Sequence, residues 1–292
     1  MSLLLAGFFA RRVARLSAWA DGAKNRTPLR WRDTRPSPFG TARVRSVIVG
    51  FVGSGSMAAA VARGWVGHVE RMLFTDSGSG RARELAREVG GEAVGSNSEL
   101  AEAVDVVVLA VKPAMLAEVA GELQRARAVI SLLGAISLEE VSAAFPGAEV
   151  ARVMPNVGVE VRKGVLCVAG AADAEVREML GVLGHVVELP DEEFDAATAV
   201  MGCSPAYLAL VVEAIADAGA EDGLDPGLAR ELVVETAAGT AELLRHRRPA
   251  DLRRAVASPG GSTEAGLEAL DREGAREAFE AAVRASLEKM RG

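Results

Sequence analysis

The chain has 292 residues, of which 50% are apolar, and its formal net charge is −7 at pH 7. This acidic balance argues against a surface that binds nucleic acid or an anionic membrane. Two separated cysteines and three histidines offer neither a disulfide framework nor a His-based metal site, and no apolar run reaches 18 residues, so we expect no metal, no membrane span and a cytoplasmic location.

Residues 1–45 are expected to lie outside the folded part of the chain. Residues 3–10 form an apolar run that is too short for a bilayer, and Arg11 and Arg12 follow it, whereas a secretory signal has its positive residues in front. Residues 19–45 are rich in Arg and Pro without a period. We interpret the segment as a disordered extension or as a start codon assigned too early, with a targeting peptide as the alternative.

From residue 46 onward, strand-like and helix-like segments alternate. A β-branched run at 47–52 predicts a strand, and residues 57–65 predict the helix after it. Residues 104–111 are almost continuously apolar, as in a strand buried on both faces of a parallel sheet. Further elements are expected as a helix at 81–89 and strands at 71–75, 128–133, 149–153 and 165–168. The alternation predicts a doubly wound, Rossmann-type α/β domain over residues 46–190.

After about residue 190 the strand pattern stops and long helical patterns follow. Helices are expected at 194–201, 206–220, 226–244, 249–257 and 264–290. These helices carry more apolar surface than a bundle of this size can bury by itself. Residues 191–292 are therefore expected to form an all-helical domain that makes a homodimer or a higher homo-oligomer.

A glycine pattern follows the first predicted strand and opens the first helix. In Gly53-x-Gly55-x-x-Ala58, the first glycine permits a tight turn and the second lets a pyrophosphate approach the backbone. The small third residue lets the helix pack closely on the strand. Alone the pattern is weak, but at the first strand–helix junction of an α/β series it predicts binding of NAD or NADP.

The end of the second predicted strand carries a divided signal about the cofactor. Asp76 stands where an acid would bind the adenine-ribose hydroxyls and favour NADH. Ser77 follows at once, with Ser79, Arg81 and Arg83 beyond it, and these side chains could serve a 2′-phosphate of NADPH instead. Asp76 as a simple turn former is a third interpretation.

Three further polar residues stand where the cofactor crevice is predicted. Lys112, in Ala110-Val111-Lys112-Pro113, follows a central strand and faces either the crevice or an exposed loop. Asn97 either caps a helix or contacts the adenosine. Asn156 ends a later strand, where a polar ligand explains the amide better than packing does, although a turn is the ordinary alternative.

Near the C-terminus, Ser258-Pro259-Gly260-Gly261-Ser262-Thr263 interrupts the helical pattern. Proline lacks an amide donor and paired glycines disfavour a helix, so helix packing does not require this run. It supplies backbone N–H groups and hydroxyls at the start of the next helix, where a small carboxylate would be stabilised. A glycine-rich helix connection is the alternative.

Five motifs in this order resemble the pyrroline-5-carboxylate reductase family, and the likeness runs from about residue 44 to the C-terminus. They are Gly53-Ser54-Gly55-Ser56-Met57, Ala110-Val111-Lys112-Pro113, Arg152-Val153-Met154-Pro155-Asn156, Gly202-Cys203-Ser204-Pro205-Ala206-Tyr207 and Ser258-Pro259-Gly260-Gly261-Ser262-Thr263. The last is far more specific than the Rossmann glycines. The resemblance implies a dinucleotide domain followed by a helical dimerisation domain, and NADPH- or NADH-dependent reduction of 1-pyrroline-5-carboxylate to L-proline, the last step of proline biosynthesis.

The same resemblance implies roles for individual residues. It implies that the turn around the cofactor's pyrophosphate is lined by Gly53, Ser54, Gly55, Ser56 and Met57. It also implies that Asn97 contacts the adenine ribose, and that the nicotinamide side of the cofactor is bordered by Ala110, Lys112, Pro113 and Asn156. The resemblance implies that the substrate carboxylate is bound by the loop of Ser258, Gly260, Gly261 and Ser262. It implies a catalytic role for the hydroxyl of Thr263, beside the ring nitrogen. In such enzymes this loop works against the partner subunit's cofactor domain.

Departures from the family pattern bear on the substrate rather than on the type of reaction. Val157 replaces a usual threonine, and Met201 and Cys203 are less expected at their positions. A reductase of a related cyclic imine acid and a non-catalytic NAD(P)-binding protein are the alternatives. A β-hydroxyacid-type dehydrogenase is disfavoured because residues 206–220 contain no lysine. The expected mechanism is direct hydride transfer to the imine carbon without a covalent intermediate.

Overall fold

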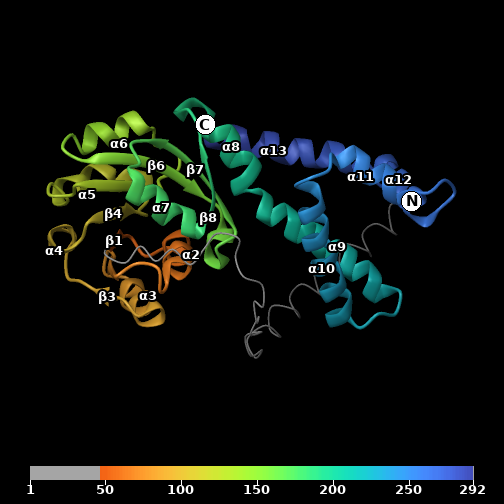
Figure 1. Ribbon diagram of the computed structural model, residues 1–292, viewed down its shortest axis with the longest axis horizontal. Helices are drawn as coiled ribbons and strands as arrows, with labels where there is room; N and C mark the ends of the chain where they lie inside the picture. Colours follow the sequence, from red (N-terminus) through yellow and green to blue (C-terminus); the bar gives the residue numbers. More distant parts are fainter. Residues whose placement is uncertain (1–46, 292) are drawn as a thin grey trace, which may run out of the picture. The chain divides into compact units, whose positions relative to one another are not determined.

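The computed structural model describes residues 47–291, so the predicted extension at residues 1–45 lies outside the described residues. Its central feature is an eight-stranded sheet with the order β3-β2-β1-β4-β5-β6-β7-β8 (Figure 1). The strands are β1 (Ile48–Val52), β2 (Arg71–Thr75), β3 (Glu92–Ala93), β4 (Val106–Leu109), β5 (Ala128–Ser131), β6 (Glu149–Pro155), β7 (Gly164–Gly170) and β8 (Gly184–Glu188). The predicted α/β fold class is confirmed.

The first six strands are parallel, whereas β7 pairs with β6 in the antiparallel direction. Only the short helix η3 (Val157–Val161) separates β6 from β7, and a connection this short cannot cross over to a parallel neighbour. This reversal was not predicted from the sequence, and neither were β3 and β8. β3 has two residues, and β8 is a half-exposed edge strand with glycine and histidine, so neither has the apolar run of a buried strand.

Helices cover both faces of the sheet and enclose two apolar cores. On one face lie α2 (Ser56–Trp65), α3 (Arg81–Val89) and α7 (Ala174–Leu183), and on the other lie α4 (Asn97–Ala103), α5 (Leu116–Glu122) and α6 (Leu138–Ala144). Neighbouring residues of one strand alternate between the cores, since Phe74 belongs to the first and Leu73 to the second. In the first core the indole N–H of Trp65 donates to the carbonyl oxygen of Met179 over 2.8 Å, which ties α2 to α7.

Beyond β8, only helices follow among the described residues. They are η4 (Asp191–Glu193), α8 (Phe194–Ala197), η5 (Thr198–Gly202), α9 (Ser204–Glu221), α10 (Pro226–Leu244), α11 (Pro249–Val256), α12 (Ser262–Arg272) and α13 (Ala275–Arg291). The predicted helix at 194–201 is present as α8, which continues into the π-helical turn η5. The single helix predicted at 264–290 is wrong, because Gly274 has φ of +70° and separates α12 from α13.

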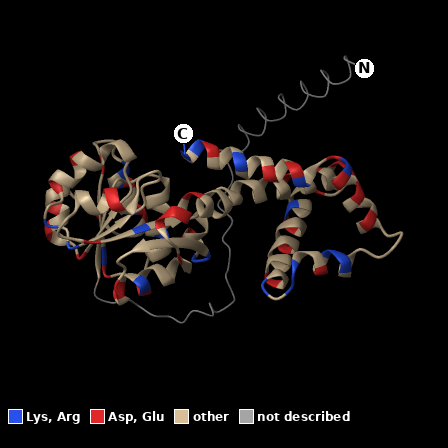
Figure 2. Ribbon diagram, turned by 90° about the horizontal axis from the view of Figure 1, so that it is seen from above, with Lys and Arg blue, Asp and Glu red and all other residues tan. Residues whose placement is uncertain are grey.

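Leucine side chains on α9 and α10 remain exposed in the single chain. Leu208 is 64% exposed and Leu232 is 51% exposed, and the only buried residues of the two helices are Ala216 and Ala229. Figure 2 shows acidic and basic residues interspersed along the helices, without a long stretch of one sign. The apolar side chains therefore form a surface that residues 47–291 leave uncovered.

One helical stretch of the described residues, Asp191–Glu221, is long and apolar enough to cross a membrane by length and composition alone. The expectation from the sequence that the chain has no membrane span is not tested by this criterion, which the core helix of a soluble protein can also meet. Ser204 and Pro205 interrupt the apolar run without adding charge, so the run is short while the stretch as a whole stays apolar.

Candidate cofactor and substrate site

The carboxyl ends of the parallel strands place several predicted site residues at one edge of the sheet. In the strand register, Val52 of β1 lies beside both Thr75 of β2 and Leu109 of β4. The loops that begin at Gly53 and Ala110 therefore start next to each other. Strand order runs outward in opposite directions from β1 and β4, and this switch point is where doubly wound sheets bind their ligands.

Position 53 requires glycine because the backbone here passes close to the loop that begins at Ala110. Its φ is +95°, and a Cβ atom on it would lie 2.6 Å from the carbonyl oxygen of Ala110. Its N–H donates to the carbonyl oxygen of Thr75 over 3.2 Å. The turn after β1 is thereby held against the ends of both flanking strands, as a dinucleotide turn requires.

Gly55 and the start of α2 fit a pyrophosphate group. A Cβ atom on Gly55 would meet no other atom within 4 Å, so the space above this residue is open. α2 has no side-chain cap and no acidic residue in its first turn, which leaves its N–H groups free for an anion. Ser56 is exposed and Met57 is partly buried against the first core. The Ser54 hydroxyl, in contrast, donates to the carbonyl oxygen of Thr75 over 3.1 Å.

The carboxylate of Asp76 is committed to its own loop. It accepts hydrogen bonds from the backbone N–H groups of Gly78 and Ala82, each over 2.8 Å, and from the Ser79 hydroxyl over 3.0 Å. Partial burial opposes ionisation by desolvation, but these hydrogen bonds outweigh it and lower the pKa of Asp76. The turn-forming interpretation therefore describes Asp76 better than a ribose-binding one. Ser77 is exposed beside it.

Asn97 is the predicted adenosine contact, and both the oxygen and the nitrogen of its side-chain amide are hydrogen-bonded within the fold. Its Oδ1 accepts from the Thr75 hydroxyl over 2.6 Å, and its Nδ2 donates to the Glu122 carboxylate over 2.6 Å. α4 begins at Asn97, but the side chain that caps this helix is that of Ser96. The amide thus links the end of β2 to the end of α5. The sequence contained no signal for Thr75, whose buried hydroxyl completes this link.

The residues after β4 remain open to a ligand. Ala110 is half-buried next to Gly53, and Lys112 and Pro113 are exposed at the start of the short helix η2 (Pro113–Met115). No hydrogen bond or ion pair of the Lys112 ammonium occurs within the described residues. The exposed ammonium group is therefore not engaged by the described part of the fold.

Asn156 serves mainly to shape its turn. Its Oδ1 accepts from the N–H groups of Gly158 and Val165 over 3.2 and 3.1 Å, and its Nδ2 donates to the carbonyl oxygen of Met201 over 3.2 Å. Both lone pairs of the side-chain oxygen are used, so a ligand could be reached only through the second Nδ2 hydrogen or the backbone. The ordinary alternative of a turn residue is the better description of the side chain.

A buried ion pair joins Arg152 of β6 to Asp191 of η4. It was not predicted from the sequence. Arg152 is 5% exposed, and its Nη1 lies 2.8 Å from Oδ1 of Asp191. The N–H of Leu138 donates to the other carboxylate oxygen over 3.0 Å, and the guanidinium carbon lies 4.5 Å from the centre of the Phe194 ring. A charged residue inside the apolar β6 sequence was the available signal, because a buried cation needs a partner.

The Ser258–Thr263 loop is bonded internally. Gly260 has φ of +74°, and its N–H donates to Oε2 of Glu264 over 2.7 Å. The N–H of Gly261 donates to the carbonyl oxygen of Ser258 over 2.9 Å. Ser258, Pro259, Gly260, Ser262 and Thr263 are exposed. The predicted anion-binding amides are thus in one loop, but two of them already have partners.

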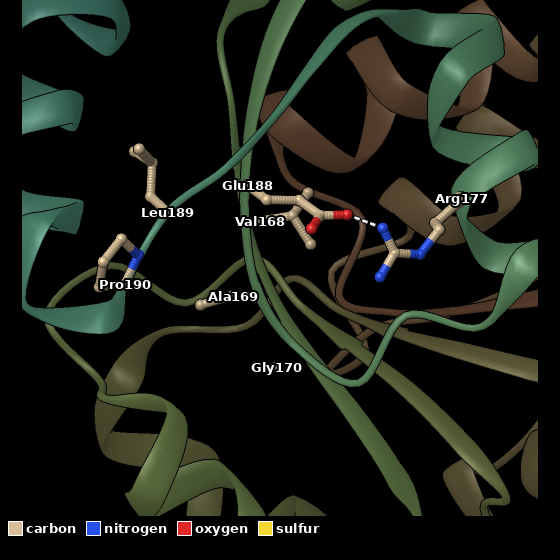
Figure 3. A pocket seen from close by; sticks show the side chains of 7 residues that line it. All are labelled: Val168, Ala169, Gly170, Arg177, Glu188, Leu189 and Pro190. Carbon is tan, nitrogen blue, oxygen red and sulfur yellow. Dashed lines mark ion pairs between the residues drawn. The ribbon is translucent and has the colours of Figure 1, made fainter.

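A cavity of about 290 Å³ lies elsewhere, beside β7 and β8 (Figure 3). The side chains of Arg177 and Glu188 point toward each other across it and form an ion pair. None of the predicted site residues lines this cavity, which lies at the carboxyl ends of β7 and β8. Because β7 runs antiparallel to β6, this edge of the sheet is opposite the carboxyl ends of β1 to β6. Strand topology therefore favours the switch point, rather than this cavity, as the candidate cofactor site.

Two family models match separate parts of the chain. The family described as "Pyrroline-5-carboxylate reductase dimerisation" matches residues 191–292. The family described as "NADP oxidoreductase coenzyme F420-dependent" matches residues 48–134.

Relatives match the chain over nearly their whole length. A pyrroline-5-carboxylate reductase of Synechocystis is 34% identical over 82% of this chain and 96% of its own length. The Thermus thermophilus reductase is 35% identical over 81% and 94%, and pyrroline-5-carboxylate reductase 3 of Mus musculus is 34% identical over 82% and 93%. The chain belongs to the pyrroline-5-carboxylate reductase family.

Solved structures of reductases share this fold. The 1-pyrroline-5-carboxylate reductase of Streptococcus pyogenes aligns with a TM-score of 0.77 at 29% identity, over 84% of this chain and 98% of that one. The Plasmodium falciparum pyrroline carboxylate reductase with NADP bound aligns with a TM-score of 0.73 at 25% identity, over 84% and 97%. Membership of the pyrroline-5-carboxylate reductase family makes this chain an NAD(P)H-dependent oxidoreductase.

Proposed function

We propose that this enzyme reduces 1-pyrroline-5-carboxylate to L-proline by direct hydride transfer to the imine carbon. The observation that carries the proposal is the glycine turn at the sheet's switch point in a chain that also has the Ser258–Thr263 loop. The turn fits a dinucleotide, and the loop offers backbone amides and hydroxyls to a small carboxylate. A reductase of a related cyclic imine acid is the second candidate, favoured by Val157 and Met201 beside the Asn156 turn.

The residues at the switch point bind and orient the cofactor. The backbone of Gly53 to Gly55 and the first turn of α2 would hold the pyrophosphate, and Lys112 would contact the ribose on the nicotinamide side. When bound there, the reduced nicotinamide supplies the hydride. Asn156 holds the turn after β6 against Met201 and so shapes the nicotinamide side of the crevice.

The Ser258–Thr263 loop binds and orients the substrate. Its backbone amides would hold the carboxylate, and the Thr263 hydroxyl would orient the ring nitrogen or relay a proton to it. A protonated imine accepts hydride most readily, and it can acquire that proton from water. Positioning and electrostatics therefore account for the protein's part in the reaction.

Steady-state oxidation of NADPH and NADH by the homo-oligomer tests this function directly. We expect turnover of 1-pyrroline-5-carboxylate with kcat/KM of about 10⁴ M⁻¹s⁻¹ or above. Parallel assays with 1-pyrroline-2-carboxylate test the related-imine alternative. Tight cofactor binding without turnover of either imine would contradict the proposal and favour a non-catalytic NAD(P)-binding protein.

NADPH is expected to be the better cofactor. The Asp76 carboxylate is engaged with the N–H groups of its own loop and is poorly placed to accept the two ribose hydroxyls of NADH. Exposed Ser77 and Arg81 are available for a 2′-phosphate, whereas the Ser79 hydroxyl is bonded to Asp76. The ratio of kcat/KM values for the two cofactors should therefore exceed 1 in favour of NADPH. A lower KM for NADH at equal kcat would show that Asp76 leaves its loop.

Thr263→Val is expected to lower kcat by about 100-fold, the usual scale for loss of one positioned donor in an active site. Valine keeps the shape of threonine but cannot orient the ring nitrogen or pass on a proton. Thr263→Ser retains the hydroxyl and should restore most of the rate. Unchanged turnover in the valine variant would contradict the role of this hydroxyl.

We also propose a cytoplasmic homodimer, or a higher homo-oligomer, in which a second copy covers the apolar face of α9 and α10. Residues 191–292 match the reductase dimerisation family, and exposed leucines on both helices supply the apolar surface. A second copy explains this surface better than lipid does, because Glu213 and Asp217 lie on the exposed part of α9. The loop of one subunit would then complete the cofactor site of its partner.

Leu232→Glu is expected to dissociate the dimer, because it puts a charge into a surface that association would bury. Sedimentation equilibrium should give the monomer mass for this variant and at least twice that mass for the unaltered chain. Glu231→Gln, at an exposed neighbouring position, is the control and should remain associated. An unaltered chain that sediments as a monomer at micromolar concentration would contradict the proposal.

A further inference from the structure

The carboxylate of Glu264 already occupies part of the loop to which the proposed function assigns the substrate carboxylate. Its Oε2 accepts from the N–H of Gly260 over 2.7 Å. Glu264 is the third residue of α12, whose cap residue is Gly261, so its side chain reaches back past the helix start. The loop is therefore closed on itself by a carboxylate of the same chain.

The remaining loop amides make this contact decisive for ligand binding. The N–H of Gly261 is used by the carbonyl oxygen of Ser258, and no side-chain cap is present at the start of α12. An incoming carboxylate must either displace Glu264 from Gly260 or bind beside it. Two carboxylates at one amide repel each other, and both favour the same partly positive helix start.

We propose that Glu264 is a specificity-determining residue that competes with the substrate carboxylate for the N–H of Gly260. The side chain occupies this N–H in the free enzyme and rotates away when the imine acid binds. It thereby weakens binding of every carboxylate ligand at the loop, including the product, and promotes product release. This inference rests on the proposed function, because it requires the Ser258–Thr263 loop to hold the substrate carboxylate.

The competition predicts a change that depends on the ligand's carboxylate. Glu264→Ala frees the N–H of Gly260 and removes the negative charge, so the Kd of L-proline, measured by calorimetry with NADP⁺ present, should fall about three- to tenfold. Glu264→Gln keeps an acceptor for the N–H without the charge and should give a smaller decrease. The KM for 1-pyrroline-5-carboxylate should follow the same order. Pyrrolidine, which lacks the carboxylate, should show no such dependence.

Glu268→Ala is the matched control, because it removes an exposed acid one turn further along α12 and makes no contact with the loop amides. It should leave the Kd of L-proline unchanged. Weaker or unchanged proline binding in Glu264→Ala, with an unaltered melting temperature, would overturn the inference. An equal gain in the Glu268 variant would do the same, since the effect would then be general electrostatics.

A failure of the proposed function is distinguishable from a failure of this inference. If the unaltered enzyme neither reduces 1-pyrroline-5-carboxylate nor binds L-proline, then the function itself is wrong. If the unaltered enzyme does both and Glu264→Ala does not tighten binding, then only the competition is wrong. Glu264→Gln serves as the second test if the alanine variant unfolds, because glutamine retains the hydrogen bond to Gly260.

Discussion

Gly53→Ala is expected to abolish cofactor binding and to lower the free energy of unfolding by about 3 kcal/mol. The added Cβ atom would lie 2.6 Å from the carbonyl oxygen of Ala110, far inside normal contact distance. Ala110 cannot move aside easily, because its N–H donates to the carbonyl oxygen of Val52 over 2.8 Å. The φ of +95° adds backbone strain that glycine alone avoids.

Urea unfolding and an NADPH fluorescence titration measure the two effects of Gly53→Ala separately. We expect the Kd of NADPH to rise by at least about 100-fold, because the turn that holds the pyrophosphate must shift. A variant with unaltered stability and unaltered NADPH affinity would contradict the assignment of the turn.

Gly55→Ala is the matched comparison, and it should weaken NADPH binding without destabilising the fold. Gly55 has φ of −80°, and a Cβ atom on it would meet no atom within 4 Å. The methyl group would project into the space that the pyrophosphate is expected to occupy. Loss of affinity at constant stability would separate ligand contact from folding at this turn.

Asp191→Ala is expected to lower the free energy of unfolding by about 3 kcal/mol, near the lower end for breaking a buried ion pair. The substitution leaves the guanidinium of Arg152 buried without its counter-ion and the N–H of Leu138 without its acceptor. The Asp191 side chain is 28% exposed, so water can compensate for part of the loss. The phenylalanine ring above Arg152 cannot replace a carboxylate.

Chemical denaturation of Asp191→Ala, with Glu192→Ala as an exposed neighbouring control, measures this effect. The control should change stability by less than about 0.5 kcal/mol. The double variant Arg152→Met with Asp191→Ala removes both charges and should recover part of the lost stability. If Asp191→Ala lowered the free energy of unfolding by no more than the control does, the ion pair would not hold β6 to η4.

Much of the fold could be predicted from the sequence because the buried strands are apolar and the turns have distinctive residues. The predicted bounds of the helix at 226–244 match α10 and those of the strand at 71–75 match β2. A central parallel strand such as β4 must be apolar on both faces, so its run is visible without any structure. The turn at Gly53 could also be predicted, because its glycine pattern stands at the first strand–helix junction of an α/β series.

The direction of β7 and the use of individual polar side chains could not be predicted in this way. Strand direction depended on the length of the connection after Asn156, and β8 became a strand only because β7 offered an unpaired edge. Asp76 stands where the sequence predicted an acid, whereas Glu264 was given no role from the sequence. Each nevertheless bonds to a backbone N–H that only the folded loop places within reach.

The sequence by itself determined the α/β class, the switch-point turn and the loop of Ser258 to Thr263, because these depend on apolar patterning and on local backbone requirements. Only the tertiary structure decided which hydrogen-bonding groups remain open to a ligand. Asn156 and Asp76 are engaged within the fold, whereas Lys112 is exposed. The physical reason is that a polar side chain bonds to whichever donor or acceptor the packed chain brings near it, and that neighbour is set by contacts distant in sequence.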